Sequence, residues 1–136
     1  MKVLVDTPIW SLALRRKNQA ANASIRSELS SLVEDGRVTI IGPIRQEILS
    51  GVKERAQFDR LREHLRAFPD VDITSDDYEE AASFYNRCRA RGLQGSNTDF
   101  LICAIAARNE FSIFTTDKDF GHFAKVLPIV LHGTET

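Results

Sequence analysis

Five acidic residues stand where a buried chain segment gives way to a turn or a helix. Asp6 ends a short apolar run, and Glu47 lies on the first turns after a second one. Asp99 follows a Ser-Asn-Thr turn, and Asp117 and Asp119 follow a further apolar run. Carboxylates brought together repel each other and burial raises their pKa, so a divalent cation is the simplest way to hold them in one place. A set of carboxylate oxygens suits Mg²⁺ or Mn²⁺.

Each acid also has an ordinary structural interpretation when it is taken alone. Asp6 would cap a turn or a helix, and Asp99 would interact favourably with a helix dipole in a first turn. Asp117 or Asp119 would cap a short helix, and Glu47 would be a common helix residue. The cation site is favoured only by the joint occurrence of these acids at the ends of strands.

Other reactive residue types show no comparable arrangement. The three histidines, His64, His122 and His132, lack the paired spacing of a zinc site. Cys88 and Cys103 lie in apolar helical contexts, which is typical of core residues. Neither a glycine-rich phosphate loop nor a G-x-S-x-G sequence occurs. Nucleotide cofactors and serine hydrolysis are therefore unsupported.

Alternating strands and helices must position these acids. Short apolar segments predict strands over residues 2–6, 38–41, 71–73, 112–115 and 129–131. Helical spacing and caps predict helices from Thr7 onward and over residues 20–34, 42–49, 53–68, 75–91, 99–108 and 120–124. This order predicts one α/β domain over residues 1–136, with an approximately five-stranded parallel sheet sandwiched between helices. Sites in such sheets form at the carboxyl ends of the strands, which is where the acids fall.

Length and composition exclude several classes of protein. The chain has 136 residues, of which 43% are hydrophobic and 27% are charged, and its net charge is −1. Two cysteines are too few for a secreted disulfide scaffold, and no apolar run approaches the ~18 residues of a membrane span. The sequence shows no secretory leader pattern. We therefore expect a cytoplasmic enzyme or binding domain without a membrane association.

Four segments in order resemble the PIN-domain ribonucleases, and most closely the VapC-type toxins of bacterial type II toxin–antitoxin pairs. They are residues 5–7, 46–51, 98–106 and 115–120, and the resemblance covers essentially the whole chain. One departure is Cys103, where such toxins usually have alanine. The resemblance implies that four acids are catalytic: Asp6, Glu47, Asp99 and Asp117. It further implies that Asp6, Asp99 and Asp117 bind the metal, and that the supporting residues are Thr7, Thr115 and Asp119.

The family resemblance also implies an activity and partners. The activity is endoribonuclease cleavage dependent on Mg²⁺ or Mn²⁺, in which water attacks the phosphorus and leaves a 5′-phosphate and a 3′-hydroxyl. A transfer RNA, a ribosomal RNA loop or a messenger RNA would all fit the same acids. The expected protein partners are a small antitoxin and a second copy of the chain in a homodimer. Ile9, Trp10 and Leu14 would supply apolar surface for such an interface, or would belong to the core.

A polyanion reaching an acidic site needs basic residues nearby. The candidates for RNA binding are Arg15, Arg16, Arg87, Arg89 and Arg91, because the planar guanidinium group suits phosphate. A second arginine-rich segment, residues 53–66, also contains acids at helical spacing and could be an ordinary solvated helix face.

Two other functions compete with a nuclease. A non-catalytic RNA-binding or protein-interaction member of the same fold is the main alternative. A phosphoryl-transfer domain also places acids at strand ends, but a phosphatase of that kind needs a second acid two residues after the first, where this chain has Pro8.

Overall fold

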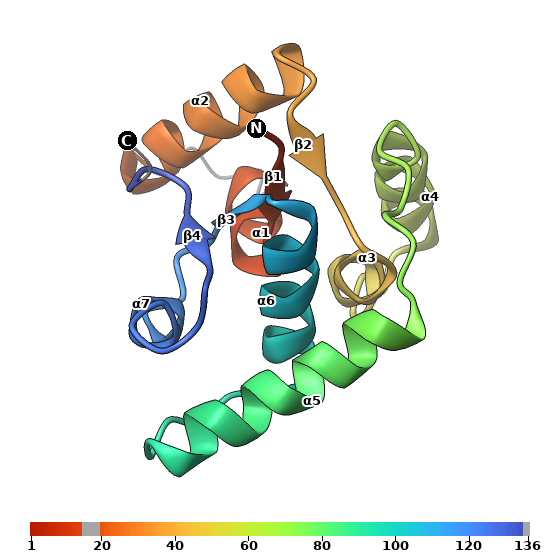
Figure 1. Cartoon of the computed structure of the whole chain (residues 1–136). Coiled ribbons are helices and arrows are strands. Elements are labelled where there is room, and N and C mark those ends of the chain that lie inside the picture. The colour runs from red at the N-terminus through yellow and green to blue at the C-terminus, as the bar shows by residue number, and fades with distance from the viewer. Residues whose placement is uncertain (15–19, 135–136) are drawn as a thin grey trace.

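A computed structural model describes residues 1–14 and 20–134 (Figure 1). Within these ranges the elements run β1 (Val3–Val5), α1 (Thr7–Leu14), α2 (Ala20–Glu34), β2 (Val38–Thr39), α3 (Gly42–Leu49), α4 (Arg55–Leu65), α5 (Ser75–Ala90), α6 (Asn97–Asn109), β3 (Ser112–Phe114), α7 (Asp119–Phe123) and β4 (Val130–Leu131). The predicted helices all form, with ends that differ from the prediction by at most three residues.

The strands form one parallel sheet in the order β2-β1-β3-β4. Leu4 of the central strand β1 lies opposite Thr39 on one side and Ile113 on the other. All three residues of β1 are buried, as expected for a parallel strand covered on both faces. Because the strands are parallel, their carboxyl ends lie at one edge of the sheet. The predicted α/β architecture is confirmed.

The sheet has four strands in the described residues, and the predicted strand over residues 71–73 is wrong. Only a single parallel bridge forms there, between Ile40 and Asp70, with the Val71 N–H donating to the Ile40 carbonyl at 2.9 Å. Pro69 cannot donate a ladder hydrogen bond just before the bridge. Thr74 already caps the next helix just after it. The segment between them is too short to extend the ladder.

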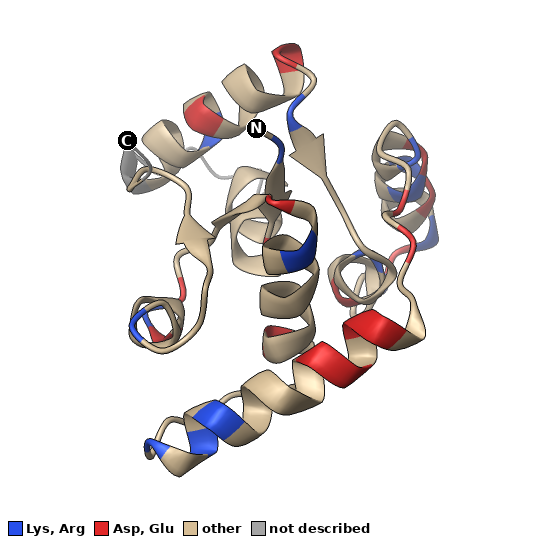
Figure 2. Ribbon diagram, viewed as in Figure 1, with Lys and Arg blue, Asp and Glu red and all other residues tan. Residues whose placement is uncertain are grey.

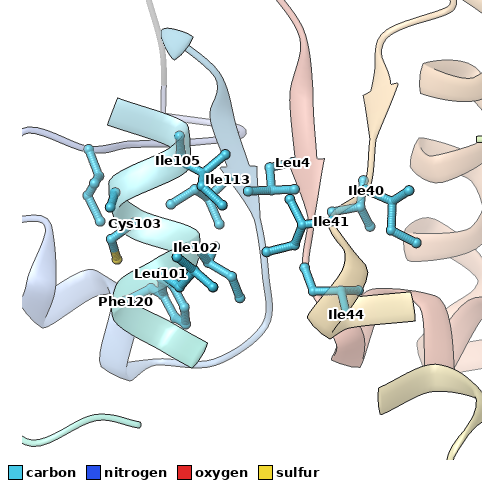
Figure 3. Close-up of a cluster of buried hydrophobic side chains, with 14 of the residues drawn as sticks. Leu4, Ile40, Ile41, Ile44, Leu101, Ile102, Cys103, Ile105, Ile113 and Phe120 are labelled. Atoms are coloured by element: carbon cyan, nitrogen blue, oxygen red, sulfur yellow. The ribbon is translucent and has the colours of Figure 1, made fainter. Parts of the chain in front are cut away.

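Helix α6 supplies much of the core and crosses in front of the sheet, with α1 behind it (Figure 1). Every residue from Phe100 to Ala106 is buried. Ile102 and Ile105 point toward the strands that carry Leu4 and Ile113 (Figure 3). This burial explains why the sequence of α6 is almost uniformly apolar.

The apolar residues of α1, which could have formed either an interface or part of the core, are mostly buried. Ile9 and Trp10 are core residues with 0% and 1% exposure, and the Trp10 indole N–H donates to the Val5 carbonyl at 3.1 Å. Leu14, at the end of α1, is 37% exposed. Only Leu14 therefore remains available as apolar surface.

Helix α5 packs along α6 and separates charge along its length (Figure 2). Its first turn carries Asp76 and Asp77, and its last turn carries Arg87 and Arg89, the arrangement that a helix dipole favours. The buried Asp77 carboxylate accepts a hydrogen bond from Arg108 of α6 at 2.9 Å. This ion pair fixes the acidic end of α5 and directs the basic end toward the start of α6.

No helix within residues 1–14 and 20–134 combines the length and the apolar character needed to cross a membrane.

Candidate active site

The carboxyl edge of the sheet gathers the predicted acids from four elements. Asp6 directly follows β1, and Asp117 lies between β3 and α7. Asp99 is in the first turn of α6, and Glu47 is on α3 after β2. The parallel register of β1 and β3 places Asp6 and Asp117 on neighbouring strands.

A chain of hydrogen bonds connects three of these acids. The Asp6 carboxylate accepts from the Thr7 N–H at 2.8 Å and from the Thr115 hydroxyl at 2.8 Å. The Thr7 hydroxyl donates to Glu47 Oε2 at 3.3 Å, and the Asp117 N–H donates to Thr115 Oγ1 at 3.0 Å. The chain therefore runs from α3 through β1 to the loop after β3. The two threonines hold the carboxylates of Asp6 and Glu47 and the backbone of Asp117 in place.

The Asp6 carboxyl is buried and has a strongly raised pKa. Only 6% of the residue is exposed, and burial raises the pKa of its carboxyl from 3.8 to about 6. The hydrogen bonds from Thr115 and Thr7 lower the pKa, while the charges of Asp99 and Glu47 raise it further. Burial outweighs the hydrogen bonds, so the ionised carboxylate lacks compensation from the protein. The electrostatic effect of Asp99 and Glu47 also indicates that both charges lie near Asp6.

Asp99 has a structural role in addition to its place in this cluster. Its Oδ2 accepts from the Ser96 N–H at 3.0 Å, and its own N–H donates to the Ser96 hydroxyl at 3.1 Å. This reciprocal capping box fixes the start of α6. Among the described residues, none donates a hydrogen bond to Asp99 Oδ1, so this oxygen can bind a ligand.

Ser96 was not among the predicted site residues, although its sequence signal was present. The pattern Ser-x-x-Asp before an apolar run is a capping-box signature, which assigns Ser96 to Asp99 directly.

Asp117 and Asp119 differ in their environment. Asp117 is half-buried, and its Oδ1 accepts from the Asp119 N–H at 2.9 Å. Asp119 is exposed and lies in the first turn of α7. Asp117 therefore belongs to the hydrogen-bonded chain, whereas the Asp119 side chain lies at its outer edge. Glu47 is exposed as well, and only Thr7 holds its carboxylate.

The donor atoms fit a hard divalent cation in chemistry. The carboxylates around Asp6 offer only oxygen ligands, and their negative charges repel each other. Mg²⁺ or Mn²⁺ would stabilise such an arrangement. In residues 1–14 and 20–134, no group of three or more His, Cys, Asp or Glu side chains lies close enough together to hold a metal ion. An open depression of about 380 Å³ lies beside the acids and is lined by residues from three elements, among them Thr7, Gln46, Glu47 and Thr98.

Cys103 lies beneath the acids. Burial raises the pKa of its thiol well above 9, and the nearby charge of Asp99 adds to this shift. Cys103 is therefore a neutral core thiol, which agrees with the interpretation of the sequence.

The basic candidates at the end of α5 are exposed at the same side of the molecule as the start of α6 and α7 (Figures 1 and 2). The guanidinium of Arg87 lies 5.3 Å from the ring centroid of Phe84. Arg89 lies 5.7 Å from the ring centroid of Tyr85 and donates to its hydroxyl at 3.3 Å. These aromatic contacts restrict both side chains. Arg15 and Arg16 lie outside the described residues.

The PIN domain family model matches residues 3–126. Among solved structures, the chain is similar to VapBC2 from Rickettsia felis bound to a DNA fragment from their promoter, with a TM-score of 0.78, 19% identity, and coverage of 97% of this chain and 98% of that chain. The chain is also similar to FitAcB from Neisseria gonorrhoeae, with a TM-score of 0.75, 20% identity, and coverage of 96% of this chain and 96% of that chain. A third similar structure is VapBC-5 from Mycobacterium tuberculosis, a member of the VapBC family of toxin-antitoxin systems. Its TM-score is 0.65 at 18% identity, with coverage of 96% of this chain and 98% of that chain. No curated protein matches. At these identities the similar structures share the fold.

The raised pKa of Asp6 predicts that this residue costs stability. The folded state binds the proton more tightly than the unfolded state, so its stabilising effect is complete below about pH 4 and is lost as the pH rises through about 6. We expect Asp6→Asn, without divalent cations, to raise the free energy of unfolding by about 3 kcal/mol at pH 7.5 and by almost nothing at pH 4. The asparagine oxygen can accept from the Thr7 N–H, and its NH₂ group can donate to the Thr115 hydroxyl oxygen, so the second hydrogen bond is kept with its direction reversed.

Urea denaturation at the two pH values measures this difference. Asp35→Asn, which alters an exposed carboxylate after α2, is the control and should show no such gain. An Asp6→Asn variant that is less stable than the wild type at pH 7.5 would contradict the account.

Proposed function

This chain belongs to the PIN domain family, and on that premise we propose that it is a metal-dependent endoribonuclease that hydrolyses phosphodiester bonds of RNA at the acids around Asp6. The observation that carries the proposal is the buried Asp6 carboxylate, which lies near the charges of Asp99 and Glu47 and whose pKa burial raises to about 6. Perturbed carboxylates that converge in one place are characteristic of functional sites. The whole chain, residues 1–136, would act as one nuclease domain.

We assign Asp6, Asp99 and Asp117 as the residues that would hold the cation. The described residues show no group of three side chains placed to hold a metal directly. Mg²⁺ keeps several of its own waters in proteins, so one or two of these carboxylates would bind it directly and the others through water. When bound, Mg²⁺ or Mn²⁺ lowers the pKa of water and neutralises charge that develops on the phosphoryl group. Asp119, exposed beside Asp117, is a supporting residue.

The remaining residues would orient the reaction. Glu47 accepts a hydrogen bond from Thr7 and is exposed to solvent, so it can accept a proton from the attacking water. Thr115 holds both the Asp6 carboxylate and the Asp117 backbone, so it fixes the spacing of these two acids. Attack by water in line with the leaving 3′-oxygen leaves a 5′-phosphate and a 3′-hydroxyl.

We further propose that the chain is the toxin of a VapBC-type toxin–antitoxin pair and acts on RNA in the cytoplasm. Two similar structures, from Mycobacterium tuberculosis and Klebsiella pneumoniae, are described as members of toxin–antitoxin systems or complexes. A depression of about 610 Å³ between α1, α2 and the end of α4 is lined by apolar residues, of which Leu14 and Val33 are exposed. Such surface suits a protein partner, whether a small antitoxin or the second copy of a homodimer.

Cleavage of total cellular RNA by the purified, partner-free chain tests the proposed activity. We expect cuts at few sites in Mg²⁺ or Mn²⁺, none in EDTA, and 5′-phosphate ends. Asp99→Asn should reduce the rate by at least about 100-fold while the fold persists, because the asparagine oxygen can still accept from the Ser96 N–H.

The matched control is Asp76→Asn, which alters an acid in the first turn of α5 that is 72% exposed. It should cleave as the wild type does. Equal cleavage by Asp99→Asn would contradict the assigned site. Binding of RNA without cleavage in any metal would favour the alternative function, a non-catalytic RNA-binding member of the fold.

The arginines at the end of α5 should bind the RNA backbone. In the Asp99→Asn background, Arg89→Glu with Arg91→Glu should weaken RNA binding and reduce the slope of log affinity against log salt by about 1–2, since each lost phosphate contact on a single strand removes about 0.7. The control is Arg55→Glu with Arg60→Glu on α4, two exposed arginines away from the site. An equal slope in the two double variants would make the α5 arginines ordinary surface residues.

A further inference from the structure

Gly95 lies directly before the capping residue of α6 and is covered by aromatic rings. A Cβ added there would lie 2.7 Å from Cζ of Phe123 and 3.0 Å from Cε2 of Phe100. Both distances are shorter than ordinary carbon–carbon contacts. The positive-φ glycines of the chain are Gly36, Gly51, Gly92 and Gly133, so the backbone of Gly95 does not itself demand glycine. Close packing requires it.

The rings that cover Gly95 have no room to retreat. Phe100 and Phe123 are each 1% exposed, and their centroids are 4.9 Å apart. Phe120 lies 5.4 Å from Phe123, and Tyr85 lies 5.5 Å from Phe100. Aromatic rings packed at these distances form a continuous layer. A group added at Gly95 must therefore displace the Phe123 ring, which α7 holds within this buried layer.

This aromatic layer connects the elements that carry two of the site acids. Phe100 directly follows Asp99 in α6, and Gly95 precedes Ser96, the residue that caps Asp99. Phe120 and Phe123 form the buried face of α7, which begins two residues after Asp117. The close approach of Gly95 and Phe123 therefore joins the start of α6, which carries Asp99, to α7, which follows Asp117.

We infer that Gly95 and the Phe123 ring act as a spacer that sets the separation of Asp99 and Asp117, and that Gly95 is a positioning residue for cation binding. The inference rests on the proposed nuclease function for its catalytic consequence. A methyl group at position 95 pushes α7 away from the start of α6 and widens the gap between the two carboxylates. Metal affinity and turnover then fall, while RNA binding at the α5 arginines is preserved.

Gly95→Ala tests the spacer, with Mn²⁺ binding measured by the electron paramagnetic resonance signal of the free ion. We expect the dissociation constant of Mn²⁺ to rise by about 10-fold or more, the scale seen when groups that orient metal ligands are altered. kcat should fall by a similar factor, with KM for RNA within about twofold of the wild type. Gly121→Ala is the control, since a Cβ at that position of α7 meets no atom within 4 Å.

A second substitution, at position 123, distinguishes an effect on the spacing of the acids from a general loss of stability. Leucine at position 123 lacks the ring carbon that a Cβ at position 95 would meet, so Gly95→Ala combined with Phe123→Leu should recover most of the Mn²⁺ affinity. The double variant also serves if Gly95→Ala alone fails to fold. Wild-type Mn²⁺ affinity in Gly95→Ala, or the same loss in the single and double variants, would overturn the inference.

Amide resonances of the metal-free protein give a readout independent of the nuclease. Gly95→Ala should shift the Asp117 amide, which is distant in sequence, and Gly121→Ala should leave the Asp99 amide in place. If the wild type neither binds Mn²⁺ nor cleaves RNA, the proposed function fails, while the resonances still test the spacer. An unchanged Asp117 amide in a folded Gly95→Ala protein contradicts it.

Discussion

The whole site depends on one carboxylate that the fold removes from water. Asp6 ends the central strand and is 6% exposed, and the two hydrogen bonds that it accepts do not offset the loss of hydration. The neighbouring charges of Asp99 and Glu47 act in the same unfavourable direction. Such uncompensated burial of a carboxylate is characteristic of functional sites, which supports the proposed cation site. A divalent cation would add an attraction to each carboxylate that offsets both the burial of Asp6 and the repulsion between the acids.

The surrounding elements keep the acids in position despite their repulsion. Asp99 is fixed by its capping box with Ser96, and Asp117 is fixed by Thr115, which also holds Asp6. Asp6, Asp99 and Asp119 stand at the starts of α1, α6 and α7, where the positive ends of the helix dipoles reduce the cost of negative charge. The buried face of α6 and the aromatic layer beneath α7 make this geometry rigid, so the acids cannot relax apart into solvent.

Much of this arrangement was predictable because it depends on local patterns. Apolar runs that end in an acid identified β1 and β3, and parallel connectivity then placed Asp6 and Asp117 at one edge. The prediction of a strand over residues 71–73 was wrong because Pro69 and the cap at Thr74 leave room for only one bridge to the neighbouring chain segment. The role of Gly95 was unpredictable, since its partner ring at Phe123 is distant in sequence and only the tertiary packing brings them together.

Proton release on cation binding tests the central claim most directly. At pH 6 about half of the Asp6 carboxyls carry a proton, which an incoming cation must displace. Calorimetric titration of the protein with Mn²⁺ in two buffers of different ionisation enthalpy measures the number of protons released per bound ion. The account predicts release of about half a proton per bound ion at pH 6 and almost none at pH 8. Mn²⁺ binding with no proton released at pH 6, or no binding at either pH, would contradict it.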